Sequence, residues 1–191
     1  MFAAGANPAV RWEWEKVARE LAQRGQRVLM PNLHSDPEVK PGSGDGSRLA
    51  KVLDLLVKQL RNETGRPDAE AHYSKQAQPS TADITVMGKS WGGGQALRYT
   101  AHRPGIVSQL VLVAPMGRDS PADWRGRAPA ASIPALLLYA KDDATFAGVR
   151  EVKRRVLAGV LPKLQVHQVE KGGHAVKPEY APVIASFLGL K

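Results

Sequence analysis

Residues 84–92 read Ile84-Thr85-Val86-Met87-Gly88-Lys89-Ser90-Trp91-Gly92, an apolar run that passes directly into the pattern Gly-x-Ser-x-Gly. The first four residues predict a buried strand, and the residues from about Gly92 to His102 predict the helix that follows it. A strand that turns at once into a helix needs small residues around the corner, and Gly88 and Gly92 supply them. We therefore expect Ser90 at the top of a tight turn, with its hydroxyl clear of the sheet.

Strands and helices alternate along the rest of the chain. Short apolar runs predict further strands at 27–30, 110–114 and 135–139, and another strand is predicted at 164–169. Apolar residues spaced three and four apart predict helices at 11–24, 47–64, 146–157 and 178–188. The polar or proline-bearing stretches 35–46, 66–82 and 116–134 are expected to be loops. This order predicts an α/β fold, a mostly parallel sheet with helices on both faces, in a single domain spanning 1–191.

The composition excludes several classes of protein. The chain has no cysteine, so a disulfide framework, a thiolate metal site and a cysteine nucleophile are excluded. No apolar run approaches the length of about 18 residues that spans a bilayer, and the first residues lack the pattern of a secretory signal. We expect a soluble, cytoplasmic protein, with an organelle as the alternative because the native N-terminus is uncertain.

The charge balance would suit an acidic partner. Lys and Arg number 27 against 18 Asp and Glu, which gives a net charge of +9. The densest basic cluster lies on the predicted helix 146–157 and consists of Arg150, Lys153, Arg154 and Arg155. Because no aromatic residues are interleaved with it, we interpret it as a solvated helix face, with docking of an acidic protein surface as the alternative. We expect no specific binding of nucleic acid.

Ser90 is the candidate nucleophile, and its neighbour Trp91 is a candidate oxyanion donor. The turn puts the backbone N–H of Trp91 at a helix N-terminus, where a developing negative charge is stabilised. Gly88-Lys89-Ser90 also matches the end of a phosphate-binding P-loop. That loop requires a glycine where Asp83 stands and a flexible bend where the apolar run predicts a strand, so we set the nucleotide interpretation aside.

A serine hydroxyl needs a general base, and His174 is the best placed of the five histidines. It follows the last predicted strand in a glycine-rich run, at the edge where open α/β sheets build their sites. A carboxylate must orient the imidazole, and both Asp142 and Asp143 follow the predicted strand 135–139 at the same edge. The remaining histidines are expected to be structural or exposed, namely His34, His72, His102 and His167.

Together these runs resemble the α/β-hydrolase fold superfamily of serine hydrolases, from about Gly5 to Leu188. The resemblance implies the chain order Ser, Asp, His and an acid in the pattern G-x-x-D. The run Ala140-Lys141-Asp142-Asp143 matches with alanine in place of glycine, which implies Asp143 as the acid and leaves Asp142 in reserve. The short connection 116–134 further resembles the compact, lid-poor branch that includes the CIB-like hydrolases.

The resemblance also concerns the start of the chain. Ala4-Gly5-Ala6 stands where the family has a His-Gly pair, so the N–H of Ala6 is implied as the second oxyanion donor. The family's first two strands have no counterpart, and its third survives only as Met1 to Ala4. We therefore expect a missing N-terminal segment or a partner that supplies the sheet edge.

The expected function is hydrolysis of a small ester, thioester or related acyl compound by Ser90, His174 and Asp143, with no metal and no organic cofactor. Acyl transfer to an acceptor other than water would use the same residues. A different alternative is a catalytically silent hydrolase-like subunit of a larger assembly, which the short start and the net charge of +9 favour.

Overall fold

The computed structural model describes residues 2–4, 9–30, 47–64, 84–103, 105–116, 133–147 and 157–191. Its centre is a five-stranded sheet in which every pair of neighbouring strands is parallel. The strands lie across the sheet in chain order, as β1 (Phe2–Ala4), β2 (Thr85–Lys89), β3 (Gln109–Val113), β4 (Ala135–Ala140) and β5 (Leu164–Val169). All five strands therefore end at one edge, which we call the carboxyl edge.

Backbone hydrogen bonds continue past the strand ends along the carboxyl edge. Three of them run from Ser90 N–H to Val113 O at 2.9 Å, from Ala114 N–H to Leu138 O at 2.9 Å and from Lys141 N–H to Val169 O at 2.8 Å. They join β2 to β3, β3 to β4 and β4 to β5 where the loops begin. The segments that follow β2, β4 and β5 therefore begin side by side, joined by these backbone hydrogen bonds.

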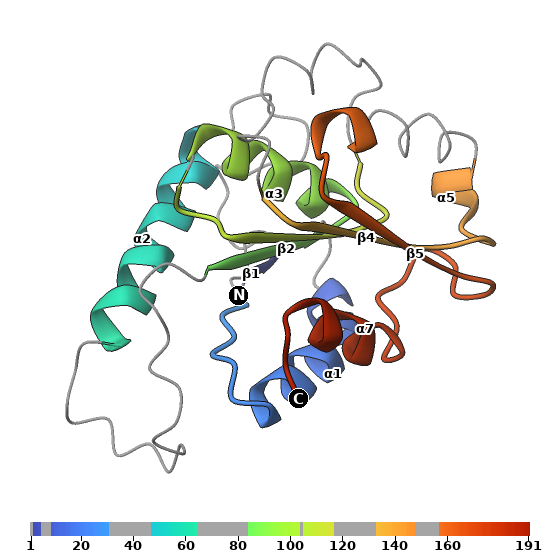
Figure 1. Ribbon diagram of the computed structural model, residues 1–191, viewed down its shortest axis with the longest axis horizontal. Coiled ribbons are helices and arrows are strands. Elements are labelled where there is room, and N and C mark those ends of the chain that lie inside the picture. The colour runs from blue at the N-terminus through green and yellow to red at the C-terminus, as the bar shows by residue number, and fades with distance from the viewer. Residues whose placement is uncertain are drawn as a thin grey trace.

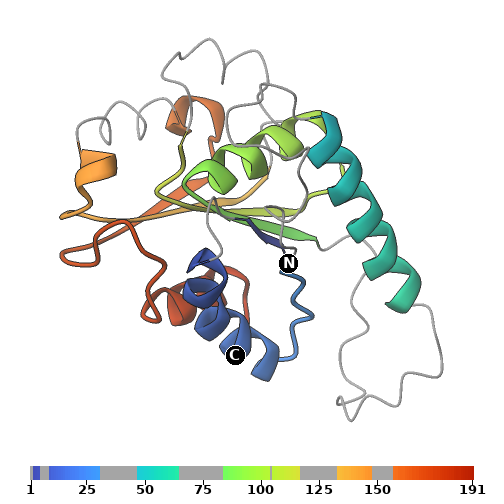
Figure 2. The same cartoon turned by 180° about the vertical axis from the view of Figure 1, so that it is seen from behind.

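Helices cover both faces of the sheet (Figure 1). One face carries α2 (Ser47–Thr64) and α3 (Trp91–His102). The opposite face carries α1 (Ala9–Gln23) and α7 (Tyr180–Phe187), which lie side by side, and the view from behind shows the same two layers (Figure 2). The inner strands of a parallel sheet covered in this way are buried on both sides, which explains why β3 and β4 read as nearly continuous apolar runs. The edge strand β5 is only partly buried and alternates with polar residues.

The side chains of β3 show how one strand serves both layers. Leu110 and Leu112 pack into the cluster beneath α2 and α3, whereas Val111 and Val113 pack into the cluster against α1 and α7. Successive side chains of a strand point to opposite faces, so four apolar residues in a row fill two separate cores. On α1, the stripe that meets the second core includes Trp14, Val17 and Leu21, none more than 1% exposed.

The predicted architecture is confirmed. The predicted strands near 84, 110, 135 and 164 are β2 to β5, each within two residues at both ends. The helices predicted at 11–24, 47–64, about 92–102 and 178–188 are α1, α2, α3 and α7. β1 has only three residues.

The prediction of a strand at 27–30 is wrong. Only Leu29 makes a single bridge there, and the run is not part of the five-stranded sheet. Its side chains still alternate, with Val28 and Met30 against one core and Leu29 against the other. The segment is therefore extended but does not form a ladder, because the run is short and Pro31, which follows it, has no backbone N–H to extend the pairing.

Several other predictions lie wholly or mostly outside the described residues. The helix predicted at 146–157 is described only at its ends, as α5 (Ala144–Ala147) and a helical turn at 157–160. The basic cluster at 150–155 and the loops 35–46 and 66–82 are not described, and neither is the interior of 116–134.

Candidate active site

Ser90 occupies a turn between β2 and α3 that few side chains tolerate. Its backbone has φ 52° and ψ −122°, a conformation that costs a non-glycine residue about 1–3 kcal/mol. Hydrogen bonds from the next loop hold it there, since the N–H of Met116 donates to the Ser90 carbonyl at 2.6 Å. The Ser90 side chain is thus fixed at the carboxyl edge of β2, with the residue 8% exposed.

Glycines let the backbone close tightly around the Ser90 turn. A Cβ on Gly88 would overlap the carbonyl of Gly92, and one on Gly93 would lie 2.8 Å from the Pro115 Cβ. A Cβ on Gly94 would overlap the Met116 carbonyl oxygen. Gly88 and Gly92 belong to the predicted pattern, but the roles of Gly93 and Gly94 depend on the approach of 114–116, which the sequence does not reveal.

His174 and Asp143 are hydrogen-bonded at the same edge. The imidazole Nδ1 lies 2.7 Å from Asp143 Oδ2. Asp143 follows β4 by three residues and is 0% exposed, while the His174 side chain, five residues beyond β5, is 27% exposed. The structure therefore brings together the candidate base and one of the two candidate acids, with the carboxylate buried behind the ring.

Asp142 makes different contacts. Its Oδ1 accepts the N–H of Gly172 at 2.9 Å and the N–H of Gly173 at 2.8 Å. The Gly173 N–H is the main cause that lowers the pKa of Asp142 below its ordinary value of 3.8, helped by Gly172 and by the charge of Lys177. Asp142 thus anchors the two residues that precede His174 and does not contact the imidazole through any bond described here.

A charged pair lies behind the Ser90 turn. Lys89, the last residue of β2, places its Nζ 2.6 Å from Glu13 Oε2, and its side chain is only 6% exposed. The same oxygen accepts the backbone N–H of Val176 at 2.9 Å. Sequence reasoning missed Glu13. The available signal was Lys89 itself, because a lysine in a buried strand is rarely unpaired.

The remaining candidates fall in different places. Trp91 is the first residue of α3, as predicted for a donor at a helix start. Ala6, the second donor, lies outside the described residues, as do His34 and His72. His102 ends α3 and His167 is part of β5, so neither adjoins Asp143 through a bond described here.

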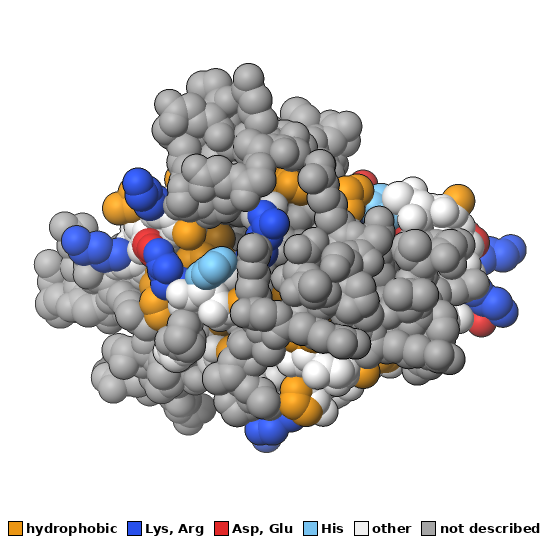
Figure 3. All heavy atoms as spheres, turned by 90° about the horizontal axis from the view of Figure 1, so that it is seen from above, with side chains coloured by type: hydrophobic (Ala, Val, Ile, Leu, Met, Phe, Trp, Pro, Cys, Tyr) orange, Lys and Arg blue, Asp and Glu red, His pale blue; other side chains and the backbone are white. Residues whose placement is uncertain are grey.

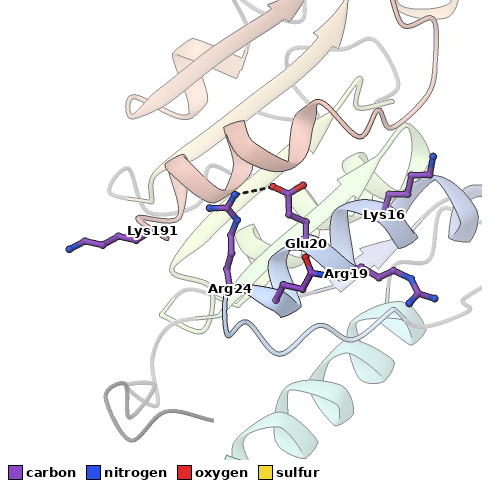
Figure 4. A pocket seen from close by; sticks show the side chains of 6 residues that line it. Lys16, Arg19, Glu20, Arg24 and Lys191 are labelled. Atoms are coloured by element: carbon purple, nitrogen blue, oxygen red, sulfur yellow. Dashed lines mark hydrogen bonds and ion pairs between the residues drawn. The ribbon is translucent and has the colours of Figure 1, made fainter. Parts of the chain in front are cut away.

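A separate groove of about 590 Å³ runs along α1 (Figure 4). Its lining consists of Lys16, Arg19, Glu20, Gln23, Arg24 and Lys191. Arg24 is paired with Glu20 at 3.0 Å and Arg19 with Glu15 at 2.6 Å, so part of the positive charge is balanced. The groove shares no residue with the pair of His174 and Asp143.

The described surface adds two observations. On the face shown in Figure 3, Lys and Arg side chains lie in several separate places. Among the helices that the structure describes, none is both long enough and apolar enough to cross a bilayer. The same residues contain no group of three or more His, Asp or Glu side chains arranged to hold a metal ion.

A parallel sheet between two helical layers, with a serine turn and a His–Asp pair at its carboxyl edge, defines an α/β hydrolase. The model of the serine aminopeptidase family S33 matches residues 66–173, more than half of the chain, and the chain belongs to that family. The matched range contains Ser90 and Asp143 and ends one residue before His174. No curated protein matches the sequence closely enough to count as a relative.

Solved structures of α/β hydrolases have the same fold. A predicted CIB-like hydrolase from Thermoplasma acidophilum is 19% identical, with a TM-score of 0.65 over 98% of this chain and 84% of the other. MGS-MChE2, an α/β hydrolase from a lagoon-sediment metagenome of Mar Chica, Morocco, is 19% identical, with a TM-score of 0.63 over 98% and 86%. A serine hydrolase involved in carbazole degradation is 13% identical, with a TM-score of 0.61 over 100% and 90%. These likenesses show that the chain has the α/β-hydrolase fold.

Proposed function

We propose that the chain hydrolyses a small ester, thioester or related acyl compound with a triad of Ser90, His174 and Asp143. The observation that carries the proposal is the 2.7 Å hydrogen bond between the His174 imidazole and the fully buried Asp143 carboxylate. A serine held in a positive-φ turn on the same sheet edge supports it. Nucleophilic acyl transfer requires a hydroxyl, a base and a carboxylate that orients the base.

In the proposed triad, the Asp143 carboxylate sets the tautomer of His174. A carboxylate accepts hydrogen bonds and does not donate them, so Nδ1 carries the proton that faces Asp143. Nε2 is then left with a lone pair that can take a proton from a hydroxyl. Burial of the carboxylate shields its side of the contact from water, which strengthens the hydrogen bond and fixes the ring orientation.

The reaction follows from these roles. Ser90 Oγ attacks the acyl carbonyl carbon while its proton passes to His174 Nε2. The tetrahedral intermediate collapses when the leaving alcohol or thiol takes that proton, and an acyl ester remains on Ser90. Water then attacks the ester with His174 again as base, and a carboxylic acid leaves. Asp143 stabilises the imidazolium in both halves.

The oxyanion would be held by backbone N–H groups. Trp91 begins α3, where the helix dipole favours negative charge. The N–H of Ala6 is the second proposed donor, carried over from the family resemblance. Because both donors are main chain, the alanine that replaces the family's histidine beside Gly5 need not remove the stabilisation.

A fluorophosphonate probe tests the nucleophile and the base. The native chain should be labelled covalently on Ser90, and Ser90→Ala should remove the label completely. His174→Ala should slow labelling by about three orders of magnitude or more while the melting temperature stays close to native, because the imidazole activates the hydroxyl and contributes little packing. Absence of labelling in folded native protein would favour the catalytically silent subunit instead.

A substrate panel tests the acyl class. Short-chain esters and thioesters are the proposed substrates, and aminoacyl amides belong in the panel because of the family's description as aminopeptidases. The native chain should turn over the short-chain esters and thioesters, and Ser90→Ala should turn over none of them. Formation of a new ester or amide when an alcohol or amine is added would instead identify acyl transfer.

A further inference from the structure

A single carboxylate oxygen joins the two segments that carry the proposed nucleophile and base. Glu13 Oε2 lies 2.6 Å from Lys89 Nζ and accepts the Val176 N–H at 2.9 Å. Lys89 immediately precedes Ser90, and Val176 comes two residues after His174. Glu13 itself belongs to α1, so three parts of the chain that are distant in sequence meet at one atom.

The contact is built into the interior. The Lys89 side chain is 6% exposed and the Glu13 side chain 27% exposed, so the ion pair is largely shielded from water. Val176 is 4% exposed and packs in the same core as Trp14, the neighbour of Glu13. Both hydrogen bonds to the oxygen have short distances, as expected when the acceptor carries a charge. A buried lysine paired with a carboxylate holds that carboxylate in a fixed place.

We propose that Glu13 is a positioning residue. Lys89 holds Glu13 in place, and Glu13 fixes the segment 174–176 against the Ser90 turn. This contact sets the distance between the His174 imidazole and the Ser90 hydroxyl. The inference rests on the proposed function. Asp142 anchors the two residues on the other side of His174, through the N–H groups of Gly172 and Gly173. The imidazole is thus held between two backbone anchors, one on each side.

A double-mutant cycle separates positioning from general damage. Glu13→Gln in the native background should slow fluorophosphonate labelling about tenfold or more, because small displacements of a base are costly. In the His174→Ala background the same change should alter the residual rate less than about twofold, because no imidazole is left to misplace. An equal loss in both backgrounds would overturn the proposal, since Glu13 would then act on the serine turn or on folding.

A second variant keeps the test valid if Glu13→Gln folds poorly. In Glu13→Leu/Lys89→Met both charges are removed together, and replacing a buried ion pair by apolar residues is often neutral or stabilising. This protein should stay folded at the assay temperature, although the unpaired Val176 N–H lowers its melting temperature somewhat. It should label about tenfold more slowly because the Val176 N–H has lost its acceptor. Labelling within about twofold of native would overturn the proposal.

Glu15→Gln is the matched control. It lies on the same helix, pairs with Arg19 on the exposed face at 2.6 Å and touches neither segment, so its labelling rate should equal the native rate.

Amide hydrogen exchange gives a readout independent of catalysis. The Val176 N–H should exchange slowly in the native chain and at least about tenfold faster in Glu13→Leu/Lys89→Met. If native protein is not labelled at all, the proposed function fails, and unchanged exchange at Val176 would overturn the positioning role separately.

Discussion

Neighbouring aspartates after β4 face different groups. Asp143 is buried and bonds the His174 ring, whereas Asp142 is exposed and bonds the backbone of Gly172 and Gly173. Successive residues of a turn point in different directions, so a shift of one position exchanges a ring contact for a loop contact. At the scale of single residues, the proposed base is therefore oriented by one carboxylate and its loop is placed by another.

Asparagine at each position distinguishes the two roles. Asp143→Asn should slow fluorophosphonate labelling by about 10³-fold to 10⁴-fold, because an amide cannot hold the imidazole in the required tautomer or stabilise its positive form. Asp142→Asn should stay within about fivefold of native, since its amide oxygen still accepts both glycine N–H groups. The comparison of labelling rates requires that the two variants have the same melting temperature. A larger loss of labelling rate in Asp142→Asn than in Asp143→Asn would reverse the assignment of the acid.

At the scale of elements, α3 packs against a loop as well as against the sheet. Its first turn approaches residues 114–116 so closely that Gly94 has no room for a methyl group beside the Met116 carbonyl. Met116 in turn donates its N–H to the Ser90 carbonyl at 2.6 Å. The conformation of the serine turn thus depends on where β3 ends and how its loop returns.

Alanine substitutions at two helical glycines test this packing. Gly94→Ala should lower the free energy of unfolding by about 1–3 kcal/mol, because backbone must move to relieve the overlap. Gly159→Ala is the control, since nothing lies within 4 Å of its added Cβ, and alanine should stabilise it by up to about 1 kcal/mol. Urea unfolding of both variants gives the comparison. Equal stabilisation of Gly94→Ala and Gly159→Ala would mean that the loop 114–116 moves aside at no cost.

The elements themselves could largely be predicted from the sequence. Apolar runs and helical spacing depend on local order along the chain, and they located β2 to β5 and α1 to α3. The run 27–30 misled because a short apolar run does not reveal whether a neighbouring strand offers free backbone groups. The order of residues also suggested His174 and two aspartates as candidates. Glu13 was missed because its contacts to Lys89 and Val176 arise only when α1 packs beside the end of β2 and the loop that carries His174.

On the scale of the whole molecule, the layer of α1 and α7 buries a phenol close to the His–Asp pair. Tyr180 is 0% exposed, and its hydroxyl has no hydrogen-bond partner within the described part of the chain. Burial, with a smaller contribution from the charge of Asp143, raises the pKa of Tyr180 to about 12. The ionised phenolate is therefore disfavoured in the folded protein and not in the unfolded chain.

This difference predicts sensitivity to alkali. The Tyr180 pKa is higher in the folded state than the ordinary 10.0, so its contribution to stability is complete below pH 10.0 and is lost as the pH rises toward about 12. The loss should be about 1–3 kcal/mol. Tyr180→Phe should remove this part of the pH dependence, as measured by urea unfolding below and above pH 10.0. An unchanged alkaline slope in the variant would contradict the shift.

The edge of the sheet where the strands begin, opposite the carboxyl edge, is suited to the attachment of a label or a surface linker. The exposed turn at Pro162 and Lys163 precedes β5, whose six residues extend about 20 Å at roughly 3.3 Å each before the loop of His174 begins. The chain contains no cysteine, so Lys163→Cys would introduce a unique thiol. A fluorophore or a surface linker coupled there would leave the opposite edge open, which suits immobilised or single-molecule assays of this hydrolase.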